Sequence, residues 1–134
     1  MTEERDRRYS DRYRFPDSRV FCREKINLGI FSQYSDPFPL NDLTKSGLCF
    51  ETDKQLSYGD KVHMKIEIPG QHKIQVIGQI RWFREKGGRP PYKVGVQFLP
   101  FGTIKGYNSF SAREKLERVI PAPPASQQDD EILQ

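Results

Sequence analysis

The stretch KVHMKIEIPGQHKIQVIGQIRWFREKGGRPPYKVGVQF, residues 61–98, decides the fold. Apolar and polar residues alternate over residues 61–68, and a period of two predicts a strand with one buried face. The apolar positions are Val62, Met64, Ile66 and Ile68. Pro69 and Gly70 then suit the central positions of a type II turn.

The rest of this stretch predicts two further strands. Residues 73–84 place a second series of alternating positions on one face: Ile74, Val76, Gly78, Ile80 and Trp82. A loop rich in glycine and proline follows, and Val94, Val96 and Phe98 then alternate with polar residues or glycine. Three strands joined by short loops predict an antiparallel meander, the frame of a small barrel or sandwich.

Upstream of the meander, residues 20–26 predict a first strand. The long connection after them contains Pro37 and Pro39, which argue against a central strand there. Residues 41–47 are predicted to form a polar turn, which leads into a short strand over residues 48–51.

Downstream of the meander the period changes from two to that of a helix. Ser111 and Glu114 have the spacing of a capping box, which predicts Ser111 as the N-cap. Leu116, Val119 and Ile120 recur at helical spacing, and Pro121 ends the pattern. This single apolar edge predicts that the helix packs on the barrel.

The 134 residues fit one domain with tails. We expect an arginine-rich flexible arm over residues 1–17, a barrel over 18–102, a helix within 103–120 and a disordered tail over 121–134. The predicted class is mainly β: a small antiparallel barrel with a C-terminal helix. The sequence has no apolar run long enough to cross a membrane and no secretory signal, so we expect a cytoplasmic protein without membrane insertion.

Arginine is concentrated near the N-terminus, although the formal net charge is only +4. Seven of the arginines fall in the first 23 residues: Arg5, Arg7, Arg8, Arg12, Arg14, Arg19 and Arg23. Interleaved acidic residues cancel much of the long-range field, so local guanidinium density remains. Such density suits a small anionic ligand better than polymeric nucleic acid.

The two cysteines and two histidines do not predict a disulfide or a metal site. Cys22 and Cys49 lie in apolar segments, and in a cytoplasmic chain both are expected to be reduced and partly buried. His63 and His72 flank a turn without other metal-ligating residues at suitable spacing, so no metal is predicted.

Two short motifs carry the functional prediction. Arg8 and Arg12 lie four residues apart just before the first strand, and Asp42, Thr44 and Gly47 follow at fixed offsets about thirty residues later. Together the motifs resemble the paired signature of PilZ domains, RxxxR followed by [D/N]xSxxG.

The resemblance extends over roughly residues 7–98 and includes the segments 56–62, 78–82 and 94–98. It implies a PilZ-type β-barrel that binds cyclic di-GMP and needs no cofactor.

The resemblance also implies roles for the motif residues. Arg8 and Arg12 would close over the ligand, pairing with guanine O6 and N7, stacking on a base or contacting phosphate. Asp42 would accept from guanine N1–H and N2–H, and the Thr44 hydroxyl would donate or accept. Gly47 would allow a sharp turn or close approach of the ligand.

Two features depart from the family pattern. Thr44 replaces the usual serine, so an added methyl group crowds the site. The connection over residues 26–40 is long and rich in proline, which leaves the second strand and the pose of Asp42 open. Arg7 stands where relatives favour a stacked ligand dimer, so the stoichiometry is open between one and two molecules.

Each motif residue also has a simpler structural interpretation. Arg8 and Arg12 could belong to a solvated arm, and Asp42 and Thr44 to a turn that bonds its own backbone. For Trp82, packing in the core is the favoured prediction, and an apolar surface that contacts the ligand is the alternative.

The main functional hypothesis is a non-enzymatic cyclic di-GMP receptor that regulates an unidentified protein partner. The sequence shows no nucleophile with a neighbouring base, no paired carboxylates and no phosphate-binding glycine loop, which argues against an enzyme. The alternatives are a PilZ-fold protein–protein adaptor that does not bind cyclic di-GMP, and a barrel that binds single-stranded nucleic acid.

Overall fold

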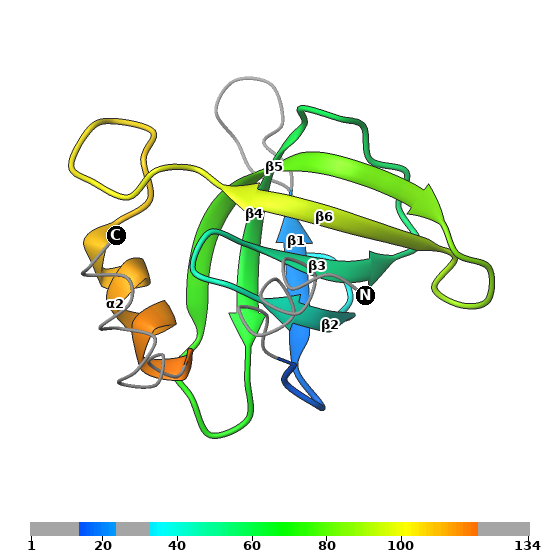
Figure 1. Cartoon of the computed structure of the whole chain (residues 1–134), viewed down its shortest axis with the longest axis horizontal. Helices are drawn as coiled ribbons and strands as arrows, with labels where there is room; N and C mark the ends of the chain where they lie inside the picture. The colour runs from blue at the N-terminus through cyan, green and yellow to red at the C-terminus, as the bar shows by residue number, and fades with distance from the viewer. Residues whose placement is uncertain (1–13, 24–32, 121–134) are drawn as a thin grey trace, which may run out of the picture.

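Six strands form a closed antiparallel barrel in the computed structural model, which describes residues 14–23 and 33–120 (Figure 1). The elements are β1 (Arg19–Arg23), β2 (Phe38–Leu43), β3 (Gly47–Thr52), β4 (Lys61–Glu67), β5 (Ile74–Glu85), β6 (Tyr92–Phe98) and the helix α2 (Phe110–Val119). Around the barrel the strand order is β1-β2-β3-β6-β5-β4. The predicted antiparallel barrel with a C-terminal helix is confirmed. Most of the predicted arm and the whole predicted tail lie outside the described residues.

The predicted meander is present as β4, β5 and β6. β4 and β5 pair from Ile66 opposite Ile74 to Lys61 opposite Gln79. In the turn between them, Gln71 N–H donates to the Ile68 carbonyl oxygen at 3.0 Å, and Gly70 has a φ of 79°. A positive φ at this position is what a type II turn requires and what glycine adopts without strain.

β2 corrects the expectation that Pro37 and Pro39 argue against a central strand in this part of the chain. Pro39 lies inside β2, opposite Arg19 of β1. The pairing between β2 and β3 begins one residue later, at Leu40 opposite Phe50, so Pro39 falls outside that ladder. A proline at the end of a ladder removes no inter-strand donor that is needed there.

The predicted polar turn over residues 41–47 is also shorter than expected. Asn41, Asp42 and Leu43 belong to β2, and Gly47 already begins β3. Only residues 44–46 connect the two strands. Asp42 is therefore fixed by a strand and not carried on a loop.

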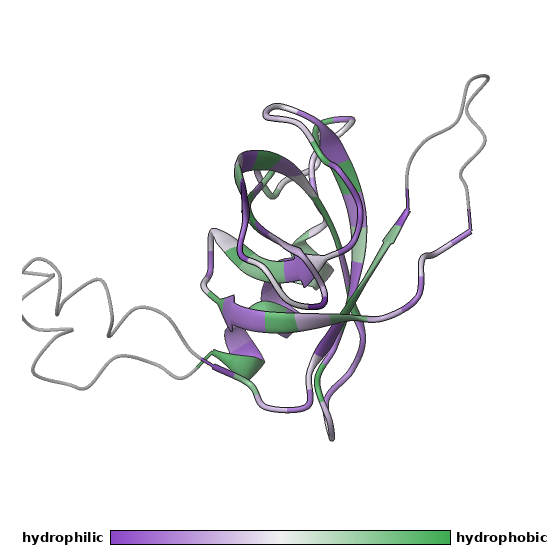
Figure 2. Ribbon diagram, turned by 90° about the vertical axis from the view of Figure 1, so that its right-hand side faces the viewer, coloured by the Kyte–Doolittle hydropathy of each residue, from purple (hydrophilic) through white to green (hydrophobic). Residues whose placement is uncertain are grey.

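The barrel interior is filled by the inward side chains of all six strands. Phe50, Leu43, Met64, Ile66, Ile74 and Ile80 are among the largest fully buried side chains. Polar and apolar residues alternate along the strands, as the purple and green segments of the ribbon show (Figure 2). α2 lies beside β5 and contributes Ala112 and Leu116 to the core, and its C-cap residue Ile120 is buried there as well (Figure 1).

α2 begins two residues earlier than the capping box predicts. Ser109 is the N-cap, with extended backbone angles, and its hydroxyl accepts from Ala112 N–H at 3.1 Å. The buried Asn108 fixes this start, because its side chain accepts from Ile77 N–H at 2.7 Å and donates to the carbonyl oxygens of Ile77 and Leu99. Ser111 is consequently inside the first turn, and its prediction as the cap is wrong. No helix in the described part of the chain has the length and apolarity needed to cross a bilayer.

Ser109→Ala should lower the free energy of unfolding by about 1 kcal/mol, because the Ala112 N–H loses its capping acceptor. Ser111→Ala is the matched control and should change stability by less than about 0.5 kcal/mol. Urea unfolding followed by circular dichroism measures both. Equal effects of the two substitutions would contradict the assignment of the cap.

Candidate ligand-binding site

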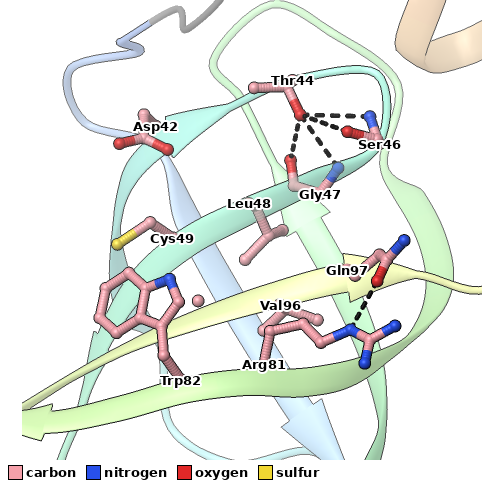
Figure 3. Close-up of a pocket in the computed structure, with 11 residues that line it drawn as sticks. Asp42, Thr44, Ser46, Gly47, Leu48, Cys49, Arg81, Trp82, Val96 and Gln97 are labelled. Atoms are coloured by element: carbon pink, nitrogen blue, oxygen red, sulfur yellow. Dashed lines mark hydrogen bonds between the residues drawn. The ribbon is translucent and has the colours of Figure 1, made fainter. Parts of the chain in front are cut away.

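A pocket of about 210 Å³ lies on the outer face of the barrel, across the neighbouring strands β2, β3, β6 and β5 (Figure 3). Its polar lining includes Asp42, Thr44, Ser46, Arg81 and Gln97, and its other lining residues include Cys49 and Trp82. Three of the sequence-predicted site residues, Asp42, Thr44 and Gly47, thus line one pocket.

The Thr44 side chain closes the turn between β2 and β3 (Figure 3). Its hydroxyl accepts from the backbone N–H groups of Ser46 (3.1 Å) and Gly47 (3.0 Å), and it donates to the Gly47 carbonyl oxygen at 3.2 Å. One donor and two acceptor positions are all that a hydroxyl has. Thr44 therefore bonds its own turn, which is the simpler interpretation that the sequence left open.

Gly47 lies where the backbones of β3 and β6 come close together. A Cβ atom at this position would lie 2.1 Å from the Val96 carbonyl oxygen and 3.3 Å from the Gln97 Cα. A side chain cannot fit without moving a strand of the barrel. This packing alone accounts for glycine here, independently of any approach by a ligand.

Asp42 is directed to the outer face by an irregularity in the pairing of β2 and β3. The register shifts between Leu40 and Asp42, so that Asp42 lies opposite Cys49. Such a bulge re-aims the side chains that follow it. Within the described ranges, the Asp42 carboxylate makes no hydrogen bond or ion pair, so its acceptor oxygens are available to a ligand.

Asp42 also lines a second pocket of about 390 Å³, together with Arg14, Phe15, Asn41 and Lys93. Arg14 is the first described residue of the chain and belongs to the predicted arm. Arg14, at the end of the arm, thus lines a pocket with Asp42, whose carboxylate also borders the first pocket.

The alternation along β5 predicted that Trp82 packs in the core, but the structure places it on the outer face. The pairing of β5 with β6 shifts between Ile80, which is opposite Val96, and Trp82, which is opposite Gly95. Arg81 is the extra residue, and beyond it the inward and outward positions exchange. Trp82 is consequently 41% exposed and lines the first pocket, and the following Phe83 packs against the core instead.

The Trp82 indole is held in place from two sides. It lies over Gly95, where a Cβ would be 2.0 Å from the indole Nε1. The Arg84 guanidinium lies 5.0 Å from the ring centroid, at cation–π distance. The ring is therefore a positioned, partly exposed aromatic surface in the pocket.

Arg81 lines the pocket beside Gln97, on the side away from the Trp82 indole (Figure 3). Its Nε donates to the Gln97 side-chain oxygen at 2.5 Å, and one Nη donates to the Tyr58 hydroxyl at 3.3 Å. These bonds use two of the five N–H donors of a guanidinium, which leaves donors for an anionic ligand.

A second carboxylate, Glu51, lies close to this region but is fully engaged. Asn41 Nδ2 donates to it at 2.7 Å, and Lys86 Nζ forms an ion pair with it at 3.0 Å. Burial raises the pKa of Glu51, but these hydrogen bonds and the charges of Lys86 and Lys93 outweigh burial, so the pKa lies below its ordinary value. Asp42 is therefore the carboxylate that the pocket offers to a ligand.

Arg7, Arg8 and Arg12 lie outside the described residues, so their predicted contacts stay predictions. Sequence reasoning missed Arg81 and Gln97 as site residues. Both are at outward positions of the predicted alternation, Arg81 after Ile80 and Gln97 between Val96 and Phe98, and that alternation was the signal that could have found them. In the described part of the chain, no group of three or more histidine, cysteine or acidic side chains could hold a metal ion.

The pocket combines a carboxylate, a guanidinium, an aromatic plane and a side-chain amide. A carboxylate accepts from adjacent N–H groups of a purine, a guanidinium contacts phosphate or a base edge, and an indole stacks on a base. The arrangement suits a small ligand that has both a flat heterocycle and negative charge.

A closed barrel of this strand order, followed by one helix, defines a small antiparallel β-barrel domain. Residues 6–106 match the family model described as the PilZ domain. This match spans more than half of the chain, so the chain belongs to the PilZ family. PilZ domains are often receptors for cyclic di-GMP and are typically non-catalytic.

Solved structures with this fold include YcgR from Escherichia coli in complex with c-di-GMP, at 16% identity and a TM-score of 0.57. The alignment covers 91% of this chain and 46% of YcgR. MrkH from K. pneumonia, also a c-di-GMP complex, is similar at 11% identity and a TM-score of 0.56, with 92% of this chain and 53% of MrkH covered. This chain thus spans about half the length of these proteins. A search of curated proteins found no match.

Proposed function

We propose that this domain is a receptor that binds cyclic di-GMP in the Asp42 pocket, with Arg8 and Arg12 closing over the ligand. The observation that carries the proposal is that Asp42 lines two neighbouring pockets. It borders the pocket that holds Arg81 and Trp82, and it borders the pocket that holds Arg14. A carboxylate without a partner among residues 14–23 and 33–120 thus lies between Arg14, at the end of the arm, and the motif residues on the barrel.

Covalent geometry supports the reach of the arm. An extended chain spans at most about 3.6 Å per residue, so the Cα of Arg12 lies within about 7 Å of Arg14 and that of Arg8 within about 22 Å. Both side chains can therefore extend to the pocket that Asp42 borders.

The chemistry of the pocket matches the two guanines and two phosphates of cyclic di-GMP. Asp42 suits guanine N1–H and N2–H, and a guanidinium of the arm suits O6 and N7. Trp82 offers a stacking surface and Arg81 offers N–H donors to a phosphate. The similar structures of YcgR and MrkH are complexes with c-di-GMP, which supports this choice of ligand. Ligand binding would order the arm and change the surface that a protein partner meets.

Calorimetric titration of cyclic di-GMP into the wild type and Arg12→Ala tests the proposal. One bidentate contact between arginine and guanine contributes about 1–3 kcal/mol, so Arg12→Ala should bind about tenfold to a hundredfold more weakly. Arg118→Ala, in the last turn of α2, is the matched control and should bind like the wild type. Equal affinities for the wild type and Arg12→Ala would refute the role of the arm.

The second candidate function is a protein–protein adaptor that does not bind cyclic di-GMP. The saturated hydroxyl of Thr44 favours it, because one predicted ligand contact is already used by the turn. NMR spectra of residues 42–47 separate the candidates. A receptor shows chemical-shift changes there on addition of cyclic di-GMP, and an adaptor shows none.

A further inference from the structure

Arg81 of β5 and Gln97 of β6 line the end of the Asp42 pocket that lies away from the Trp82 indole (Figure 3). Across the ladder between β3 and β6, Gln97 is opposite Gly47. Because Gly47 has no side chain, β3 places no side chain directly opposite Gln97. The two polar side chains therefore lie next to each other at an open part of the pocket.

The hydrogen bond between them fixes how the Gln97 amide is turned. Arg81 Nε donates to Gln97 Oε1 at 2.5 Å. A guanidinium has five N–H donors and no acceptor, so only the oxygen of the amide can lie against it. The amide nitrogen consequently points away from Arg81 (Figure 3). Its two N–H groups have no acceptor among residues 14–23 and 33–120.

Arg81 is held from a second direction by Tyr58. One Nη of Arg81 donates to the Tyr58 hydroxyl at 3.3 Å. The other Nη donates to no residue in the described ranges, and no described carboxylate forms an ion pair with the guanidinium. The pair thus offers two kinds of N–H donor side by side, one on a charged group and one on a neutral amide.

This combination of donors fits a phosphodiester. The two non-bridging oxygens of a phosphodiester share one negative charge, which one guanidinium balances. A side-chain amide can bind the second oxygen without adding another charge. The neighbouring turn does not supply this donor, because the backbone N–H groups of Ser46 and Gly47 already donate to Thr44.

The spacing along β6 places the pair at a suitable distance from the base-stacking surface. Trp82 is opposite Gly95, and Gln97 lies two residues further along β6. Two residues of a strand span about 7 Å. In a nucleotide the ribose separates the base from the phosphate. A ligand whose guanine stacks on Trp82 can therefore bring its phosphate to Arg81 and Gln97.

We propose that Arg81 and Gln97 form a phosphodiester subsite. The Gln97 amide nitrogen donates to one non-bridging oxygen, and an Arg81 Nη donates to the other. Gln97 is then a ligand-binding residue in its own right and not only a support for Arg81. This inference rests on the proposed function, because the phosphodiester belongs to cyclic di-GMP.

Gln97→Glu separates the two roles of this side chain. The variant keeps an oxygen that accepts from Arg81 Nε, but it loses both amide N–H groups and brings a negative charge to the phosphate. Calorimetric titration at physiological salt should therefore show that cyclic di-GMP binds about a hundredfold more weakly than to the wild type, because a hydrogen bond to a charged group is lost.

Gln79→Glu is the matched control. Gln79 is opposite Gln97 on β5 and does not line the pocket, so this variant adds the same charge one strand away and removes no pocket donor. Salt screens such a charge, and the affinity should stay within about threefold of the wild type. Phosphorus-31 NMR of cyclic di-GMP bound to Gln97→Met gives a second measurement, in which one of the two phosphate resonances should shift from its position in the wild-type complex.

Equal affinities of Gln97→Glu and Gln79→Glu would overturn the inference, because residue 97 would then act only by holding Arg81. Phosphorus resonances that Gln97→Met leaves unchanged would overturn it as well. In both cases binding by the wild type would still support the proposed function. A wild type that does not bind cyclic di-GMP would overturn the proposed function and this inference together.

Discussion

Gly47→Ala is expected to lower the free energy of unfolding by about 3 kcal/mol, the upper part of the range for overpacking in a rigid site. The added methyl group would lie 2.1 Å from the Val96 carbonyl oxygen, which belongs to the backbone of β6. β6 is paired with β3 on one side and with β5 on the other, so it cannot move without disturbing both ladders. The hydrogen bond from Phe98 N–H to the Ser46 carbonyl oxygen, 2.8 Å long, would be strained as well.

Urea unfolding of Gly47→Ala and Gly102→Ala measures this effect. Gly102 is the matched control, because a Cβ there meets only the side chain of Tyr107, at 3.1 Å. That side chain is partly exposed and can shift, so Gly102→Ala should change stability by less than about 1 kcal/mol. If Gly47→Ala were as stable as the wild type but lost cyclic di-GMP, the glycine would be required by the ligand and not by the barrel.

The meander could be predicted because its strands alternate regularly and its turns contain glycine at the positions that need it. β4 and its turn at Gly70 follow the period of two without interruption. One buried face fixes the register of such a strand, since a slip by one residue would expose every apolar side chain. These strands predicted an antiparallel meander and left a barrel and a sandwich open, and the resemblance to PilZ domains pointed to the barrel.

The two register shifts could not be predicted by extending this alternation. The shift after Leu40 sets the direction of Asp42, and the shift after Ile80 sets the direction of Trp82. A signal was present for the second shift: Trp82 and Phe83 are adjacent, so only one of them can face the core. Which of the two faces the core depends on the register: in the structure Phe83 is opposite the buried Val94 and packs against the core, and Trp82 lies outside.

The motif residues were predicted from spacing, but their roles depend on contacts that spacing does not contain. Thr44 closes the turn from β2 to β3 through hydrogen bonds to its own backbone. Gly47 allows the close approach of β3 and β6 because it has no side chain. Asp42 differs from them, because no described contact occupies its carboxylate. Of the three motif residues on the barrel, Asp42 is therefore the one whose substitution separates ligand binding from folding.

Asp42→Ala is expected to weaken cyclic di-GMP binding by about a hundredfold and to leave stability within about 0.5 kcal/mol of the wild type. Two hydrogen bonds from guanine to an ionised carboxylate contribute about 3 kcal/mol together, which corresponds to roughly two decades in Kd. Calorimetric titration and urea unfolding measure the two quantities, and Asp53→Ala, which changes an exposed carboxylate outside both pockets, is the control. Unchanged affinity in Asp42→Ala would exclude this carboxylate as the guanine acceptor, whereas a parallel loss of stability would show that Asp42 supports the strand instead of the ligand.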